Sequence, residues 1–102
     1  FMVKARQFYP PLPFEGPLRM NLIFIMPRPK SHFRTGKYYG MLKNTAPLHH
    51  VKTPDLDNLV KFVLDAMNKV FYVDDSQVTE IITTKEYSDT TEGFTYVKIY
   101  SL

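Results

Sequence analysis

The stretch Leu18-Arg-Met-Asn-Leu-Ile-Phe-Ile-Met26 is predicted to be a β-strand, and it decides how the rest of the 102-residue chain can fold. Every second residue from Leu18 to Met26 is large and apolar, which is the period of a strand with one buried face. Ile23 and Ile25 add apolar side chains to the opposite face. Because apolar residues occur on both faces, the pattern predicts an inner strand of a sheet, covered on each side.

A helix is predicted over residues 55–69, after a long irregular segment. At ~100° per residue, the apolar and polar residues of this segment separate onto two arcs. The apolar arc holds Leu56, Leu59, Val60, Val63, Leu64 and Met67, and the polar arc holds Asp57, Asn58, Lys61, Phe62, Asp65 and Lys69. Pro54 is a typical start signal, and Asp55 stands at the expected N-cap.

Two more strands are predicted near the C-terminus, over residues 78–86 and 94–100. The first is rich in Ile and Thr, and the second alternates strictly between two faces. The polar segment between them predicts that they pair as an antiparallel hairpin joined by residues 88–93. At the N-terminus, residues 1–8 could be the tail of a helix, and the prolines that follow exclude regular structure up to Pro17.

The composition limits the class of protein. A chain of 102 residues with 44% hydrophobic residues fits one domain with a modest core. It lacks an apolar run of ~18 residues, so no membrane span is expected. The absence of cysteine excludes disulfides and thiol catalysis and is compatible with a reducing cytoplasm. Because the chain begins at Phe1 rather than Met, it could be a fragment of a longer protein.

The charge is distributed unevenly along the chain. Residues 1–54 have a net charge of +8, whereas residues 55–102 have a net charge of −5. A basic half followed by an acidic half suits an enzyme that holds a polyanion and a cation. The simpler interpretation is that the opposite charges pair across one fold.

The basic loop, residues 28–54, has no clear period and no acidic residue. Long irregular loops in compact domains are usually functional or disordered. Cations interleaved with Phe33, Tyr38 and Tyr39 suit a nucleic acid, because phosphates meet the cations and bases stack on the rings. The alternative is a solvated, mobile loop. The predicted DNA contacts are Arg28, Lys30, Arg34, Lys37, Lys43, His50 and Lys52.

The stretch Thr53-Pro-Asp-Leu-Asp-Asn-Leu-Val-Lys61 places two carboxylates at the start of the predicted helix. The helix N-terminus favours ionised Asp55 and Asp57. Mg²⁺ commonly takes one or two carboxylates together with waters and substrate phosphate. Lys61, one turn further on, could stabilise charge on a scissile phosphate.

A second acidic pair, Asp74-Asp75, could reach the same site. The helix rises ~18 Å at ~1.5 Å per residue, and an extended segment over residues 69–75 returns ~20 Å at ~3.3 Å per residue. The alternatives are structural. Asp55 can be a cap and Asp74-Asp75 a turn, while Asp57, Lys61, Asp65 and Lys69 can form a ladder of surface pairs worth ~0.2–0.5 kcal/mol each.

The combined pattern resembles the RusA-type Holliday-junction resolvases. It consists of Pro54-Asp-Leu-Asp-Asn-Leu-Val-Lys61, then Asp65-Ala66, then Asp74-Asp75-Ser-Gln-Val78. The resemblance implies an α+β fold, a small mixed β-sheet with helices packed on it, over residues 1–102 as a single domain. It also implies that relatives have an additional early strand and helix, and often a basic residue where this chain has Thr53.

The resemblance further implies an endodeoxyribonuclease that nicks two opposing strands of a four-way DNA junction in recombination and repair. The family needs Mg²⁺ or Mn²⁺, works as a homodimer, and is often phage-borne, so a bacterial or phage-infected cytoplasm is expected. Its essential acids fall on Asp55, Asp57 and Asp75, and its essential lysine on Lys61. Asp74 could be a further metal ligand.

The sequence therefore predicts a metal-dependent, structure-specific DNA endonuclease in which a metal-activated water attacks phosphorus. Two alternatives stay open. One is a metal nuclease acting on another branched or single-stranded nucleic acid. The other is a non-catalytic DNA- or junction-binding module.

Overall fold

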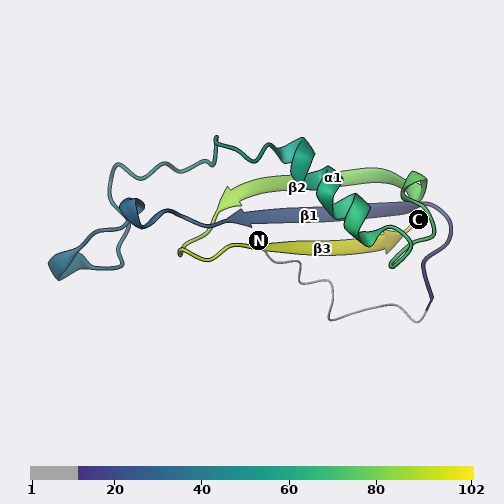
Figure 1. Cartoon of the computed structure of the whole chain (residues 1–102), viewed down its shortest axis with the longest axis horizontal. Coiled ribbons are helices and arrows are strands. Elements are labelled where there is room, and N and C mark those ends of the chain that lie inside the picture. Colours follow the sequence, from purple (N-terminus) through teal and green to yellow (C-terminus); the bar gives the residue numbers. More distant parts are fainter. Residues whose placement is uncertain (1–11) are drawn as a thin grey trace.

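The computed structural model describes residues 12–102, so the helix tail expected over residues 1–8 lies outside the described part. Figure 1 shows the α-helix packed across the strands of a sheet. The elements are β1 (Leu18–Met26), α1 (Leu56–Met67), β2 (Val78–Tyr87) and β3 (Phe94–Ser101), with the 3-10 turns η2 (Lys30–His32), η3 (Gly36–Tyr38) and η4 (Asp75–Gln77). The predicted strands and helix are thus present, with bounds that differ by one or two residues.

The strands form one mixed sheet in the order β2-β1-β3. β1 is parallel to β2 and antiparallel to β3, which makes it the inner strand that the sequence predicted. The parallel pair requires a crossover, and α1 lies within it. A small mixed sheet with a packed helix confirms the predicted α+β fold class.

The predicted hairpin between the last two strands is wrong. β3 does not pair with β2; it pairs with the opposite edge of β1, with Ile25 opposite Phe94 and Leu18 opposite Ser101. The connecting loop passes over the end of β1, where the Ser88 N–H donates to the Met26 carbonyl at 2.7 Å. This arrangement places the most apolar strand between two neighbours.

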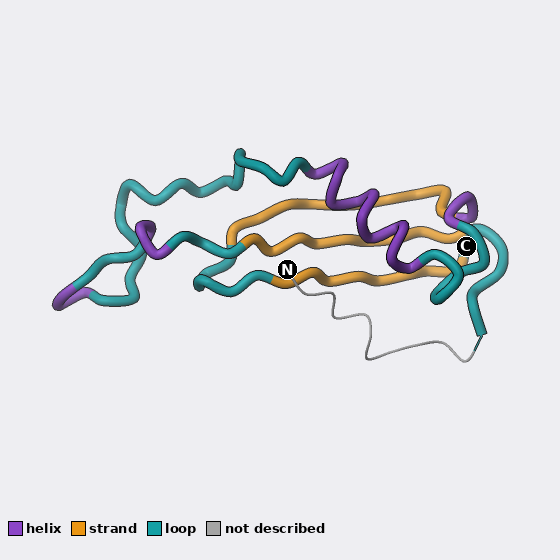
Figure 2. The backbone as a smooth tube through the Cα atoms, in the orientation of Figure 1, coloured by secondary structure: helices purple, strands orange, loops and turns teal. Residues whose placement is uncertain are grey.

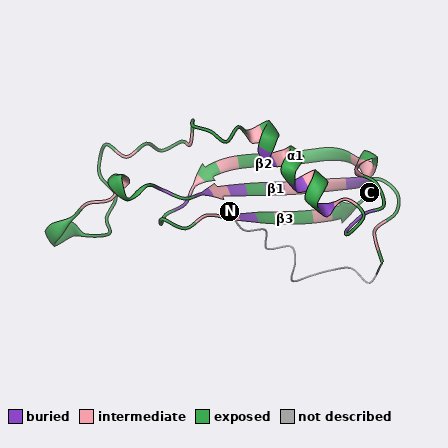
Figure 3. Ribbon diagram, viewed as in Figure 1, coloured by how far each residue is buried: buried purple, intermediate pink, exposed green. Residues whose placement is uncertain are grey.

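The core lies between β1 and α1. The side chains of Leu18, Met20, Leu22 and Phe24 are fully buried, and Figure 3 shows burial alternating along β1. The predicted apolar arc of α1 faces them: Leu59, Val63 and Met67 are buried, and Leu56, Val60 and Leu64 are partly buried against the cluster. The predicted polar arc is exposed.

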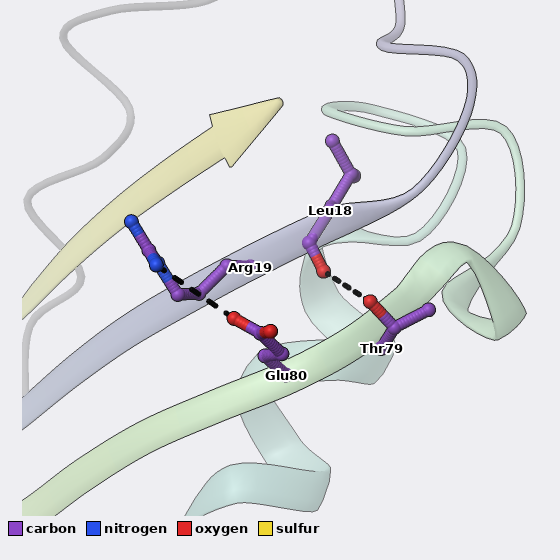
Figure 4. Close-up of polar contacts among 4 residues, drawn as sticks. All are labelled: Leu18, Arg19, Thr79 and Glu80. Atoms are coloured by element: carbon purple, nitrogen blue, oxygen red, sulfur yellow. Dashed lines mark hydrogen bonds and ion pairs between the residues drawn. The ribbon is translucent and has the colours of Figure 1, made fainter. Parts of the chain in front are cut away.

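The second face of the sheet is not covered by any element within residues 12–102, contrary to the prediction. Ile23 is 38% exposed, and Tyr96, its cross-strand partner, is 48% exposed. On this face Arg19 joins β1 to both neighbours, because its guanidinium lies 3.7 Å from the Glu80 carboxylate and 4.7 Å from the centre of the Tyr100 ring. Figure 4 shows the Glu80 pair beside the hydrogen bond from Thr79 to the Leu18 carbonyl.

The basic loop extends the molecule along the strand direction. The principal extents are 54 × 24 × 19 Å, and Figure 2 shows the loop reaching beyond the end of the sheet. Among the described residues, no helix is both long and apolar enough to cross a membrane.

Gly93 allows the crossing over the end of β1, and its substitution tests this topology. A Cβ at this position would lie 2.6 Å from Pro27 Cδ and 2.8 Å from the Ile25 carbonyl oxygen. We expect Gly93→Ala to lower the free energy of unfolding by ~1–3 kcal/mol through overpacking. Urea unfolding would measure this. Thr91→Ala, an exposed change in the same loop, should stay within ~0.5 kcal/mol; an equal effect of the two changes would contradict the close approach.

Candidate metal and DNA site

Asp55 and Asp57 lie at the exposed N-terminal end of α1. Asp55 occupies the N-cap position, but its side chain makes no capping hydrogen bond, and Asp57 lies in the first turn. The Lys85 ammonium on β2 donates to the Lys52 carbonyl at 2.8 Å and to the Pro54 carbonyl at 3.0 Å. This anchor fixes the start of α1 beside the C-terminal half of β2 and leaves both carboxylates facing solvent.

Asp74 and Asp75 lie in the turn that precedes β2. The Asp74 carboxylate accepts a hydrogen bond from the Ser76 N–H at 2.9 Å, and the Asp74 N–H donates to the Gln77 side chain at 2.8 Å. The Gln77 amide also donates to the carbonyls of Phe14 and Gly16. The acidic pair is therefore held at the end of the sheet where β1 begins.

These two carboxyls differ in their ionisation. The hydrogen bond from the Ser76 N–H lowers the pKa of Asp74. A hydrogen bond with the Asp74 carboxylate raises the pKa of Asp75, and desolvation and the negative charges of Asp74 and Asp65 act in the same direction. The surroundings of Asp75 therefore concentrate negative charge, and a nearby cation would relieve it.

The structure does not bring the two acidic groups together within one chain. Pro54 contacts Lys85, whereas Asp75 precedes Val78, so about seven strand residues, or ~23 Å at ~3.3 Å each, lie between the two groups. Within residues 12–102, no three acidic or histidine side chains gather closely enough to hold a metal ion.

The expected extended return of residues 69–75 is wrong, and the core explains why. Phe71 and Tyr72 are buried. The Phe71 N–H donates to the Met67 carbonyl at 3.0 Å, and the Tyr72 hydroxyl donates to the Leu64 carbonyl at 2.8 Å. Burial raises the pKa of Tyr72 to about 12, with smaller contributions from Asp75 and Asp65. These contacts hold residues 71 and 72 at the C-terminal end of α1. The chain returns toward the start of α1 only along β2.

Lys61 lies on the exposed face of α1, one turn beyond Asp57. Among the described residues, no ion pair within 4 Å joins Lys61 to Asp57 or Asp65; the pair that does form is Arg19–Glu80. Lys61 therefore does not form the ion pairs of the alternative surface ladder, and its ammonium stays available for an anionic ligand.

The basic loop has more local structure than its sequence suggests. Its tip is a small hairpin in which the Arg34 N–H donates to the Met41 carbonyl at 2.6 Å and the Lys43 N–H to the His32 carbonyl at 2.9 Å. Phe33 and Leu42 form a bridge between its two sides. The cations at positions 30, 37, 43 and 52 are exposed and that at 34 is partly exposed, so the predicted phosphate contacts at these positions are accessible.

Arg28 differs from the other predicted DNA contacts because it is only 7% exposed. Its Nε donates to the Ser88 carbonyl at 3.0 Å, and one terminal nitrogen donates to the Pro47 carbonyl at 2.8 Å. The guanidinium also lies 4.4 Å from the centre of the Tyr87 ring. Arg28 therefore fastens the basic loop to the end of β2 and is not placed to contact a phosphate.

Tyr87 is the residue that sequence reasoning missed. Its ring packs edge-on against His32 and His50, with centroids 5.3 and 4.8 Å away, in addition to Arg28. The sequence showed only a tyrosine at the start of a polar segment, and no local pattern distinguishes such a residue. His50, a predicted DNA contact, is partly buried in this packing and its Nδ1 has no hydrogen-bond partner among the described residues.

The packing of His50 gives the loop a pH dependence. Burial, with the charges of Lys85 and Lys52, lowers the pKa of His50 from 6.5. The folded state therefore binds fewer protons than the unfolded state below pH 6.5, and stability falls as the pH falls. We expect acidification from pH 7.5 to 5.5 to destabilise the wild type more than His50→Gln, as measured by urea unfolding. Parallel pH profiles for the two proteins would contradict this role.

Comparison with known proteins identifies the family of the chain. Residues 2–100 match the family described as endodeoxyribonuclease RusA. The chain is 37% identical over 90 residues to the uncharacterized protein YqaN of Bacillus subtilis (strain 168), covering 83% of this chain and 59% of that protein. It thus spans about three fifths of the length of this curated relative. No solved structure matches the chain significantly. Because the family match extends over nearly the whole sequence, the chain belongs to the RusA endodeoxyribonuclease family.

Proposed function

We propose that this protein is a divalent-metal-dependent endodeoxyribonuclease that resolves four-way DNA junctions by paired nicks, in recombination and repair. The observation that carries the proposal is the match to the RusA endodeoxyribonuclease family over residues 2–100. The position of the motif agrees with it, since Asp55, Asp57 and Lys61 are all exposed at or near the start of α1. We place the activity in the cytoplasm of a bacterial or phage-infected cell and propose a prophage as its source.

Asp55 and Asp57 are the residues that we assign to the metal in each chain. Two exposed carboxylates at a helix N-terminus fit a hard divalent cation such as Mg²⁺ or Mn²⁺, because such cations take oxygen ligands. A bound cation would supply charge stabilisation and a more acidic water. Lys61 would hold the scissile phosphate from the next turn of the helix.

The separation of the acids within one chain supports a homodimer with shared sites. In such a dimer Asp75, and Asp74 beside it, would approach Asp55 and Asp57 of the second copy. The raised pKa of Asp75 fits a carboxyl surrounded by negative charge, which a cation beside it would offset. Two equivalent sites related by a two-fold axis suit a junction in which two opposing strands are cut.

The exposed and partly exposed cations of the basic loop are the proposed contacts to DNA phosphates. They are Lys30, Arg34, Lys37, Lys43 and Lys52. We leave Arg28 and His50 out of this set, because their side chains pack against Tyr87. Contacts of this kind position DNA without reading its sequence.

Mixing two inactive variants tests whether the sites are shared. Asp57→Asn and Asp75→Asn should each abolish nicking of a synthetic four-way junction with Mg²⁺ while binding is retained. If each site takes acids from both chains, a mixed dimer contains one site with neither change. A 1:1 mixture should then recover about a quarter of wild-type nicking, since about half of randomly paired dimers are mixed.

The matched control mixes Asp55→Asn with Asp57→Asn, which change the same end of α1. No mixed dimer of this pair has an intact site, so nicking should stay absent. No recovery in either mixture would exclude shared sites. Unchanged nicking by Asp57→Asn alone would remove that residue from catalysis and favour the DNA-binding module without catalysis. Equal cleavage of other branched substrates would favour the broader nuclease.

Salt dependence tests the basic loop separately. Each phosphate contact on duplex DNA contributes a slope of about −0.9 to the plot of log affinity against log salt. The double variant Lys37→Ala/Lys43→Ala should therefore make the slope shallower by about 1.8. Lys98→Ala, a change of an exposed cation on β3, is the control. An unchanged slope in the double variant would exclude these two lysines from the interface.

A further inference from the structure

A cavity of about 500 Å³ lies between the tip of the basic loop and the loop that joins β2 to β3. Both walls are loops that leave the same end of the sheet (Figure 2). The volume falls in the range of small-molecule sites, about 300–1,000 Å³. Two of its lining residues, Lys30 and Arg34, are among the proposed phosphate contacts, and the other lining residues have no role in the proposed function.

The walls combine three kinds of chemistry. Lys30 and Arg34 contribute positive charge, and Phe33 and Tyr39 contribute aromatic rings. Asp89 on the opposite loop contributes an acceptor, and it forms no ion pair within 4 Å among the described residues. A site with cations, flat rings and an acceptor matches the phosphate, base and base-edge donors of one nucleotide.

The cavity is held open by hydrogen bonds on both sides. The Arg34 side chain donates to Asn44 Oδ1 at 3.1 Å, so its guanidinium is fixed at the rim. On the other wall, the Arg28 N–H donates to the Thr90 carbonyl at 3.1 Å, and the Thr90 hydroxyl accepts from the Glu92 N–H. A preformed site orders fewer groups on binding than a mobile one.

We propose that this cavity binds one unstacked nucleotide of a DNA strand held by the basic loop, an inference that rests on the proposed function and deepens it. The base stacks on Tyr39, which is 84% exposed, and on Phe33. Lys30 and Arg34 hold its phosphate, and Asp89 accepts a hydrogen bond from the base edge. Bases within an intact duplex are already stacked and paired, so the cavity favours an open strand.

The position of the cavity suits a strand that also passes the start of α1. Asp89 lies four residues beyond Lys85, whose ammonium contacts Pro54. Asp89 lies two residues beyond the end of β2 at Tyr87, so the cavity and the start of α1 lie at the same end of the sheet. One DNA strand can therefore pass both places.

Equilibrium binding without divalent metal tests the proposal, because no cleavage then competes. The probes are a fluorescent single-stranded oligonucleotide and the duplex of the same sequence. We expect Tyr39→Ala to weaken single-strand binding about tenfold or more, since one stacked base is lost, and to change duplex binding less than about twofold. Tyr39→Phe, which keeps the ring, should bind the single strand as the wild type does.

Base selection gives a second, independent measurement. Asn at position 89 can donate as well as accept, so Asp89→Asn should change the order of affinities for oligo-dA, oligo-dC and oligo-dT more than it changes their mean. Lys37→Ala, outside the cavity, should weaken all probes alike. Equal losses on single strand and duplex for Tyr39→Ala, or no loss at all, would overturn the proposal, as would an unchanged base order for Asp89→Asn.

Nicking of a four-way junction with Mg²⁺ separates this proposal from the proposed function. If the protein nicks the junction but binds single strands independently of Tyr39, the proposed nuclease function stands and the nucleotide site is excluded. If the protein does not nick the junction but binds single strands through Tyr39, the nucleotide site stands and the nuclease function is excluded.

Discussion

Burial of the apolar side of β1 under α1 is the contact on which the rest of the structure depends. Leu18, Met20, Leu22 and Phe24 lose all exposure there, and burying side chains of this size contributes ~1.5–3 kcal/mol each. The contact fixes the direction of α1 along the sheet. It therefore also fixes where the residues before and after the helix lie, including both acidic groups.

The sequence predicts the elements better than it predicts their pairing. Alternation along residues 18–26 and the helical arc of residues 56–67 arise from local periodicity, and both agree with the structure. The strand that pairs with β3 depends instead on a competition between β1 and β2, each of which has an edge that β3 could join. β1 offers a more apolar neighbour than β2, and Gly93 permits the loop to cross. A sequence pattern of two strands joined by a polar turn does not show which of these strands β3 will pair with.

In the candidate site, too, the sequence predicts the local features but not how distant segments come together. Asp55 and Asp57 were placed correctly at a helix start, because a start signal is local. The distance to Asp75 is not predictable from chain length, since a segment of this length can reach ~20 Å when extended, but the packing of its side chains decides whether it is extended. Phe71 and Tyr72 are held in the core, so the segment turns at the end of α1. The same packing that stabilises the fold therefore keeps the two acidic groups apart within one chain.

One cation of the basic loop stabilises the fold, and the others are proposed to bind DNA. Arg28 is buried, with carbonyl acceptors and the face of Tyr87 as partners, which reduces the penalty for removing its charge from water. This anchor, with Lys85 on the carbonyls of Lys52 and Pro54 at the other end, fixes both ends of the loop to the sheet. The remaining cations stay exposed on a short hairpin that is already ordered. If these cations bind DNA phosphates as proposed, less conformational entropy would be lost on binding, since the backbone of the loop is already fixed.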